Sequence, residues 1–259
     1  MLNKSQITAY LQRIGISGEI SLDLVGLNTL IRAQLTHIPF EALDVWGAGV
    51  CPSLKIDDLF QKIVVDCRGG YCFELNTLFR GLLNSLGFDA YQVIASLVDE
   101  EGVVAPPAHN VIICTIDGVA YFVDVGFGGN VPFGAMVLNE VPQLGFHLIP
   151  NGDFWYVQRV TTAGEVNMLR FRNIPAEPCE LIPLNFYISQ LPDVHFRHIL
   201  RVNLRKADGR IFSLVDHELT IRQGDQTDIF PVAGKEQLTH VLKACFGIDA
   251  AKIDIRKEY

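Results

Sequence analysis

The sequence predicts an α+β protein in which a helical part, an antiparallel β part and a mixed α/β part follow one another. Apolar residues first recur at the three- and four-residue steps of a helix. Short β-rich runs separated by turn dipeptides come next, and strand-like runs with one amphipathic helix end the chain. We therefore expect three units within the 259 residues, over 1–87, 88–190 and 191–259.

The first unit contains three segments whose apolar residues would share one helical face, over 21–35, 57–65 and 72–86. The last segment is the clearest. Its leucine and phenylalanine residues form a stripe at helical spacing, and Gly87 follows as a stop signal. These segments predict a helical N-terminal unit.

The second unit contains short runs that are rich in β-branched and aromatic residues. Turn dipeptides such as Asp117-Gly118 and Asn151-Gly152 separate several of them, which favours hairpins and hence an antiparallel sheet or a small barrel. The predicted strands cover 90–98, 110–116, 119–125, 145–149, 155–160 and 167–172.

A connection with four prolines, over 175–192, leads into the third unit and contains one predicted short helix near 184–190. The third unit itself combines strand-like runs with a final amphipathic helix, which makes it mixed α/β. Its predicted strands cover 199–204, 210–215 and 218–222, and its helix covers 235–246.

Charge, hydropathy and cysteine spacing exclude several classes of protein. The net charge is −8 and no basic stripe is present, so we expect no nucleic-acid partner. No apolar run reaches the roughly 18 residues that cross a bilayer, so we expect no membrane partner. Six scattered cysteines and the lack of a secretion signal favour a cytoplasmic location. Cys67 and Cys72 lack a second pair at zinc spacing, so we expect no metal.

Cys72 has the sequence context of a reactive thiol. It falls in the first turn of the clearest predicted helix, where unpaired amide groups and the helix dipole favour a thiolate. Gly69-Gly70 should allow a tight turn with positive φ and a close approach of another segment. A free cysteine is more often a small buried residue, but none of the other five has this context.

A nucleophilic thiol needs a base, and the base needs an orienting partner. A two-residue turn at Asp117-Gly118 would set the hairpin register so that Val111 lies opposite Asp124. His109 is then the diagonal neighbour of Asp124, close enough for a hydrogen bond between imidazole and carboxylate. A carboxylate among apolar residues also needs such a partner. The hairpin therefore predicts a base with its orienting acid.

Three ordered motifs carry a family resemblance. Residues 68–76 (Arg-Gly-Gly-Tyr-Cys-Phe-Glu-Leu-Asn) resemble the nucleophile motif of the arylamine N-acetyltransferases. Upstream, residues 38–45 resemble that family's Pro-Phe-Glu-Asn-Leu segment, with Ala42 in place of its asparagine. Downstream, residues 123–128 resemble its Asp-Val-Gly-Phe-Gly segment. The resemblance is to bacterial members, including those of the N-hydroxyarylamine O-acetyltransferase type.

The resemblance implies a fold and a chemistry. The fold would be an N-terminal helical bundle, a central antiparallel β-barrel and a C-terminal α/β lid, with the triad arranged as in cysteine proteases. Cys72 would accept an acetyl group from acetyl-CoA as a thioester, with His109 as the base and Asp124 orienting the imidazole. An arylamine, an arylhydrazine or an N-hydroxyarylamine would then take the acetyl group, which is a ping-pong sequence. The assembly would be a monomer or a homodimer.

The resemblance also implies roles outside the triad. Phe40 and Phe127 would line the acceptor pocket, and Arg68 and Glu41 would form a structural salt bridge. The CoA pyrophosphate would lie near Phe127, Gly128, Gly129 and Asn130.

Three other functions compete with acetyl transfer. The first is an amide synthase that uses the same triad to close a macrolactam from a carrier-bound acyl chain. The second is a papain- or transglutaminase-like hydrolase, which the residues around Cys72 argue against. The third is a binding protein without catalysis, which the intact triad argues against. The amide synthase stays open at this point.

Overall fold

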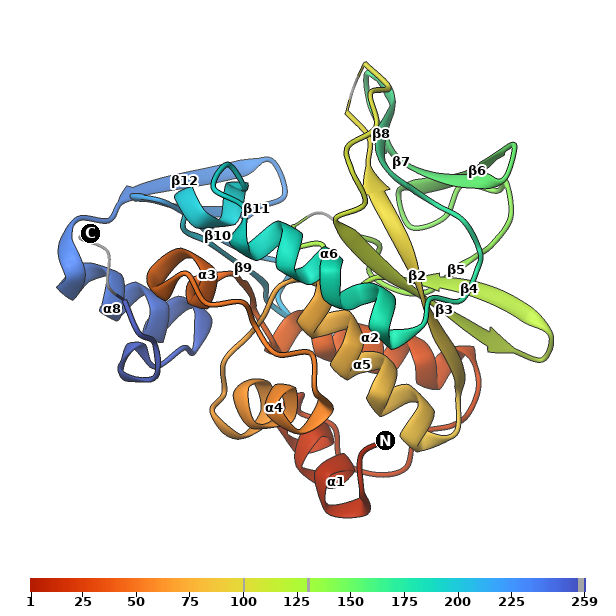
Figure 1. Cartoon of the computed structure of the whole chain (residues 1–259), viewed down its shortest axis with the longest axis horizontal. Coiled ribbons are helices and arrows are strands. Elements are labelled where there is room, and N and C mark those ends of the chain that lie inside the picture. The colour runs from red at the N-terminus through yellow and green to blue at the C-terminus, as the bar shows by residue number, and fades with distance from the viewer. Residues whose placement is uncertain (100, 130, 256–258) are drawn as a thin grey trace.

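Helices and two antiparallel sheets make up the computed structural model, which describes residues 1–99, 101–129, 131–255 and 259 (Figure 1). No helix in these ranges is long and apolar enough to cross a membrane. The α-helices are α1 (Lys4–Arg13), α2 (Leu24–His37), α3 (Leu43–Ala48), α4 (Ile56–Phe60), α5 (Cys72–Leu86), α6 (Pro178–Gln190), α7 (His195–His198) and α8 (Gly234–Phe246). The π-helical segment η1 (Gln61–Val65) follows α4, and the 3-10 turn η2 (Ala250–Lys252) lies near the C-terminus. The strands are β1 (Phe40–Glu41), β2 (Asp89–Leu97), β3 (His109–Ile116), β4 (Val119–Val123), β5 (Met136–Val137), β6 (Phe146–Asn151), β7 (Phe154–Thr161), β8 (Gly164–Phe171), β9 (Arg201–Arg205), β10 (Ile211–Val215), β11 (Glu218–Gln223) and β12 (Gln226–Pro231).

Most predicted helices are confirmed, and the differences have local causes. The helix predicted near 184–190 begins earlier, at Pro178, because a proline in the first helical turn lacks only an amide that would be unpaired there. Helix α1 was not predicted from the sequence, although Asn3 and Gln6 form a capping box that marks its start. The segment predicted over 57–65 is divided between α4 and η1.

The larger sheet has seven strands in the order β5-β4-β3-β2-β8-β7-β6. Side chains from all seven strands meet in one apolar core, so the sheet curls around its own inner face. Strands β5 and β6 remain its two edges, and β5 is only 2 residues long. The sheet is therefore a half-barrel. The predicted antiparallel sheet is confirmed, and the barrel is only half formed.

The hairpin of β3 and β4 has the predicted turn. Asp117 (φ 50°) and Gly118 (φ 78°) both adopt the left-handed backbone conformation that a type I′ turn requires. The register set by this turn pairs Ile112 with Val123 at the end of the ladder. Asp124 is consequently the first residue after β4.

Helix α5 is the central helix of the N-terminal part. It packs against β2 and β3 on one side and against α1 and α4 on the other (Figure 1). Every residue from Cys72 to Phe79 is buried, so the first two turns of α5 are held by protein on all sides. A side chain at the start of this helix therefore has a rigid support.

The smaller sheet has the order β1-β9-β10-β11-β12 and shares an apolar core with α8. Strand β1 belongs to the first predicted unit, yet it pairs with β9 through Phe40 and Asn203. Helix α6 belongs to the second predicted unit, yet its Leu181 and Ile188 lie in the helical core. The division at 87 and 190 stays a prediction, and these contacts join its three units closely.

Candidate active site

Cys72 is the first residue of α5 and only 4% of its surface is exposed. The segment before it packs very closely against β1, because a Cβ added to Gly69 would lie 2.0 Å from the carbonyl oxygen of Pro39. The close approach expected at Gly69-Gly70 is therefore present. The expected positive φ is wrong there, since the left-handed residue of this loop is Cys67 (φ 55°).

His109 and Asp124 meet at the open end of the β3–β4 hairpin. The Nε2 atom of His109 lies 2.8 Å from Oδ2 of Asp124, and both side chains are buried. The second carboxylate oxygen accepts hydrogen bonds from Asn76 Nδ2 (3.0 Å) and from the Gly126 amide (2.8 Å). The carboxylate is thus fixed from two sides and can hold the imidazole in one orientation.

The electrostatics of the site favour a charged imidazole. Burial disfavours the charged ring, but the Asp124 carboxylate and the nearby sulfur of Cys72 raise the pKa of His109 to about 10. Because Nε2 is bound to Asp124, the nitrogen left for Cys72 is Nδ1. The ring is therefore an imidazolium at neutral pH, and it lies next to the sulfur of Cys72.

Asn76 and Gly126 belong to the site, although the sequence analysis gave them no role. Asn76 lies one helical turn after Cys72 on the same face of α5, and this spacing could have revealed it. Its Oδ1 also accepts a hydrogen bond from the Val125 amide at 3.0 Å. A Cβ added to Gly126 would lie 2.7 Å from the Cα atom of Cys72, so only glycine allows this approach.

A network of five charged residues, three of them buried and two half-buried, lies behind the start of α5. Arg68 contacts Glu41 at 2.8 Å and Asp44 at 2.7 Å. Lys62 contacts Asp44 and Glu74, both at 2.7 Å. The network therefore ties β1, α3 and η1 to the helix that begins with Cys72.

The carboxylates of this network also bind backbone amides. Glu41 accepts a hydrogen bond from the Leu43 amide at 2.8 Å, so both its oxygens have partners although Ala42 offers no side-chain donor. Glu74 accepts from the Tyr71 amide at 3.1 Å and caps the start of α5. Burial, opposed by Lys62, raises the pKa of Glu74 to about 7.

Replacing Arg68 by methionine should destabilise the protein, because it leaves the fully buried Glu41 without its main counter-charge. We expect a loss of about 3 kcal/mol in the free energy of unfolding, measured by urea denaturation. Arg210→Met is the matched control, since its pair with Asp208 is 43% and 48% exposed. The control should leave the free energy of unfolding nearly unchanged, because water screens an exposed pair. Equal losses in both variants would contradict a structural role for the buried pair.

A cavity of about 610 Å³ opens onto the sulfur of Cys72 and onto His109. The ring of Phe127 stands edge-on to the imidazole, with centroids 5.5 Å apart. Phe40, Gly128 and Gly129 also line the cavity, whereas Asn130 lies outside the described residues. The remaining walls come from α6, α7 and β9 and were not predicted from the sequence. They include Tyr187, His195, Phe196 and Arg201.

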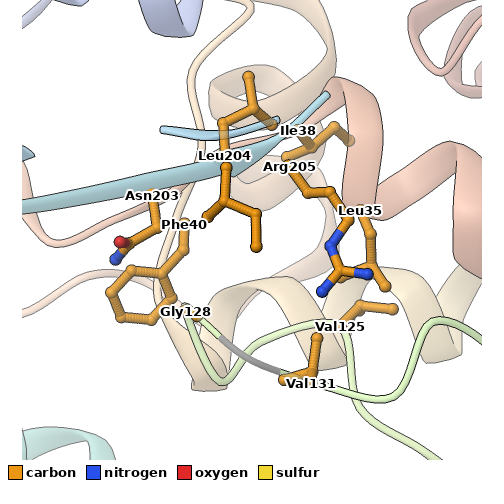
Figure 2. Close-up of a pocket in the computed structure, with 11 residues that line it drawn as sticks. Leu35, Ile38, Phe40, Val125, Gly128, Val131, Asn203, Leu204 and Arg205 are labelled. Carbon is orange, nitrogen blue, oxygen red and sulfur yellow. The ribbon is translucent and has the colours of Figure 1, made fainter. Parts of the chain in front are cut away.

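Phe40 is a fixed part of this wall. Figure 2 shows its ring beside Gly128, at the edge of a second, smaller cavity of about 30 Å³. Gly128 has a φ of 74°, and a Cβ there would lie 2.4 Å from the ring of Phe40. The glycine therefore allows the 125–129 loop to lie directly on the aromatic ring.

Comparison with known proteins agrees with this geometry. A family model described as N-acetyltransferase matches residues 23–255. The chain is also 30% identical over 250 residues to an arylamine N-acetyltransferase of Mycolicibacterium smegmatis, covering 93% of this chain and 90% of that protein. The chain belongs to the arylamine N-acetyltransferase family. This family member is thus an acyltransferase. No cluster of metal-ligating side chains occurs in the part of the chain that the structure describes.

Two further matches bear on its ligands. The structure of the Mycobacterium marinum arylamine N-acetyltransferase in complex with CoA aligns with a TM-score of 0.87 at 26% identity, covering 95% of this chain and 93% of that one. Proansamycin X synthase of Amycolatopsis mediterranei is 34% identical over 131 residues, which is 49% of this chain and 50% of that protein. The fold is shared along nearly the whole chain with the acetyltransferase.

Proposed function

We propose that this protein moves the acetyl group of acetyl-CoA to arylamines and arylhydrazines, and to the oxygen of N-hydroxyarylamines, through a thioester on Cys72. The observation that carries the proposal is the buried contact of Cys72, His109 and Asp124 at the wall of the 610 Å³ cavity. A thiol, a base and an orienting acid in this order are the parts that thioester chemistry needs.

In the first half-reaction the Cys72 thiolate attacks the carbonyl carbon of acetyl-CoA. A carbon–sulfur bond to Cys72 forms, and the bond between the carbonyl carbon and the CoA sulfur breaks. The His109 imidazolium gives its proton to the departing sulfur, so that CoA leaves as a free thiol. Asp124 keeps the ring oriented through this transfer.

In the second half-reaction the acceptor nitrogen attacks the acetyl carbon on Cys72. His109, now neutral, takes the proton from the attacking nitrogen. The bond between the acetyl carbon and Cys72 breaks, which restores the thiolate and the imidazolium. The cycle needs no oxidant and no metal, because every electron pair and proton is supplied by the two substrates and these side chains.

The walls of the cavity suit both substrates. Phe40, Phe127 and Phe196 present aromatic surface to a planar acceptor. Arg201 lines the same cavity, and its buried Nε has no hydrogen-bond partner among the described residues. A guanidinium in the cavity wall suits an anionic co-substrate such as CoA, although Asp193 in the same wall limits how much negative charge the wall can accept.

The test is the release of CoA thiol, followed with a thiol reagent at fixed acetyl-CoA while an arylhydrazine is varied. We expect the rate to rise with acceptor and then saturate. Double-reciprocal plots at several acetyl-CoA concentrations should be parallel, as ping-pong transfer requires. Intersecting lines, or no dependence on any acceptor of an arylamine and arylhydrazine panel, would count against the proposal.

The reactivity of Cys72 should persist at low pH. The pKa of His109, about 10, lies above its ordinary 6.5. The charged ring is therefore present at neutral pH and is lost only as the pH rises through that value. Alkylation of Cys72 by iodoacetamide should fall less than about tenfold between pH 9 and pH 6, where an ordinary thiol loses about 300-fold. Exposed Cys67 is the internal reference, read by peptide mass spectrometry.

A second candidate is an amide synthase that takes an acyl chain from a carrier and closes a macrolactam. The match to proansamycin X synthase favours this candidate, and it covers about half of this chain. Thioesters of long amino-acyl chains distinguish the two functions. An amide synthase should cyclise them faster than it acetylates an arylhydrazine, whereas the proposed transferase should prefer acetyl-CoA.

A further inference from the structure

A second large cavity, of about 830 Å³, lies on the other side of α6 from the active site. It is bounded by the 51–56 segment, by α5, by β2 and by α6, which crosses α5 in Figure 1. It shares no lining residue with the cavity at Cys72. Its volume lies in the range of pockets that hold small organic ligands.

The walls of this cavity are mainly apolar. Two side chains of α6 that line it, Ile182 and Phe186, are 60% and 55% exposed, which is unusual for large apolar groups one turn apart on a helix. Gln92 and Thr77 form a polar part of the lining. The side-chain amide of Gln92 donates a hydrogen bond to the hydroxyl of Thr77 at 3.0 Å. The other apolar walls are Pro52, Leu54, Ile56, Pro178 and Leu181.

The charge of the lining has one sign. Arg80 and Lys55 line the cavity and none of the described acidic residues does, in a chain whose net charge is −8. The Nε atom of Arg80 is buried and has no hydrogen-bond partner among the described residues. Acids close in sequence to the lining have hydrogen-bond partners of their own. Asp57 accepts from Gln6 at 3.3 Å, Asp58 accepts from Ser53 at 2.6 Å, and Glu180 accepts from the Glu177 amide at 2.7 Å.

We propose that this cavity binds an amphiphilic monocarboxylate, with its apolar chain or ring along α6 and its carboxylate on Arg80. The half-buried Arg80 side chain lines the cavity, and a carboxylate matches the planar donors of a guanidinium. Apolar walls around one such group are the usual composition of a small-molecule pocket. The site is separate from the acetyl-transfer chemistry.

One residue connects this cavity to the active site. Asn185 lines the cavity, donates to the Pro52 carbonyl at 2.8 Å and accepts a hydrogen bond from the Tyr71 hydroxyl. Tyr71 is the N-cap residue of α5, directly before Cys72. A ligand against α6 therefore contacts a side chain whose other partner fixes the start of the nucleophile helix.

The first experiment measures binding of dodecanoate to the intact enzyme by isothermal titration calorimetry. Dodecan-1-ol and dodecylamine, which have the same chain without the anion, should bind at least about tenfold more weakly. Arg80→Met should weaken dodecanoate binding by about tenfold or more, and Arg80→Lys should recover part of it. Ile182→Asp, at an exposed position, should also weaken it by placing a negative charge in the wall.

The second experiment locates the ligand. Cys179 lines the cavity and is exposed, whereas Cys67 is equally exposed and lies outside it. Dodecanoate should slow the reaction of Cys179 with N-ethylmaleimide at least about threefold and leave Cys67 unchanged, as read by peptide mass spectrometry. The proposal is overturned if the alcohol binds as tightly as the acid, if Arg80→Met and Ile182→Asp bind like the wild type, or if Cys179 is not protected.

Discussion

Replacing Cys72 by serine is expected to abolish acetyl transfer while the fold stays intact. The hydroxyl has almost the size of the thiol, so the buried position at the start of α5 can accept it. It is much less acidic, however, and His109 cannot hold it as an anion at neutral pH. We expect the rate of CoA release to fall by about 10⁴-fold or more, and no acetyl adduct to form in the mass spectrum of the protein.

The matched control is Cys67→Ser. Cys67 is five positions upstream in the same loop, is exposed, and lies outside the 610 Å³ cavity. This variant should keep the activity of the wild type within about twofold. Circular dichroism and urea unfolding should show that both variants are folded. Acetyl transfer that survives in Cys72→Ser would mean that the thioester mechanism is wrong.

Replacing Asp124 by asparagine is expected to have the second largest effect. Asn76 Nδ2 and the Gly126 amide both donate to Oδ1 of Asp124, so the amide oxygen of the new side chain must take that place. Its NH₂ group would then face Nε2 of His109 and force the ring into the tautomer that carries its proton on Nδ1. That nitrogen could no longer take a proton from Cys72. We expect kcat/KM to fall by about 10³- to 10⁴-fold.

The change should also appear in the pH dependence of Cys72. Without the carboxylate, the charge that raises the pKa of His109 is lost, so iodoacetamide should react mainly above the ordinary thiol pKa of about 8.5. Asp117→Asn is the control, since asparagine tolerates positive φ in the turn at the far end of the same hairpin. An unchanged alkylation profile in Asp124→Asn would show that the ring does not depend on this carboxylate.

The parts of the site that could be predicted from the sequence depend on local rules. Asp117-Gly118 specifies a two-residue turn, and the turn then sets which residues of β3 and β4 are opposite each other. Helix α5 was predicted with its observed bounds, Cys72–Leu86, because its apolar stripe and Gly87 lie within a single segment. The proximity of His109 and Asp124 follows from these rules alone.

The parts that could not be predicted depend on contacts between distant segments. Tyr187, Phe196 and Arg201 reach the cavity only through the packing of α6, α7 and β9, which no periodicity encodes. A positive φ was wrongly predicted at Gly69. Glycine permits either a left-handed backbone or a close approach of another segment, and Gly69 permits the close approach of Pro39. The half-barrel likewise depends on whether the edge strands β5 and β6 pair, which local sequence does not decide.

The type I′ turn at Asp117-Gly118 also makes catalysis sensitive to the length of a loop that touches no substrate. A slip of one residue of β4 along β3 would bring Val123 or Val125 to the place of Asp124 and turn the carboxylate to the opposite face. Insertions or deletions in this turn should therefore be tolerated much less well than in other surface loops. The solvent-exposed residues Asp117 and Gly118 therefore determine the distance between His109 and Asp124.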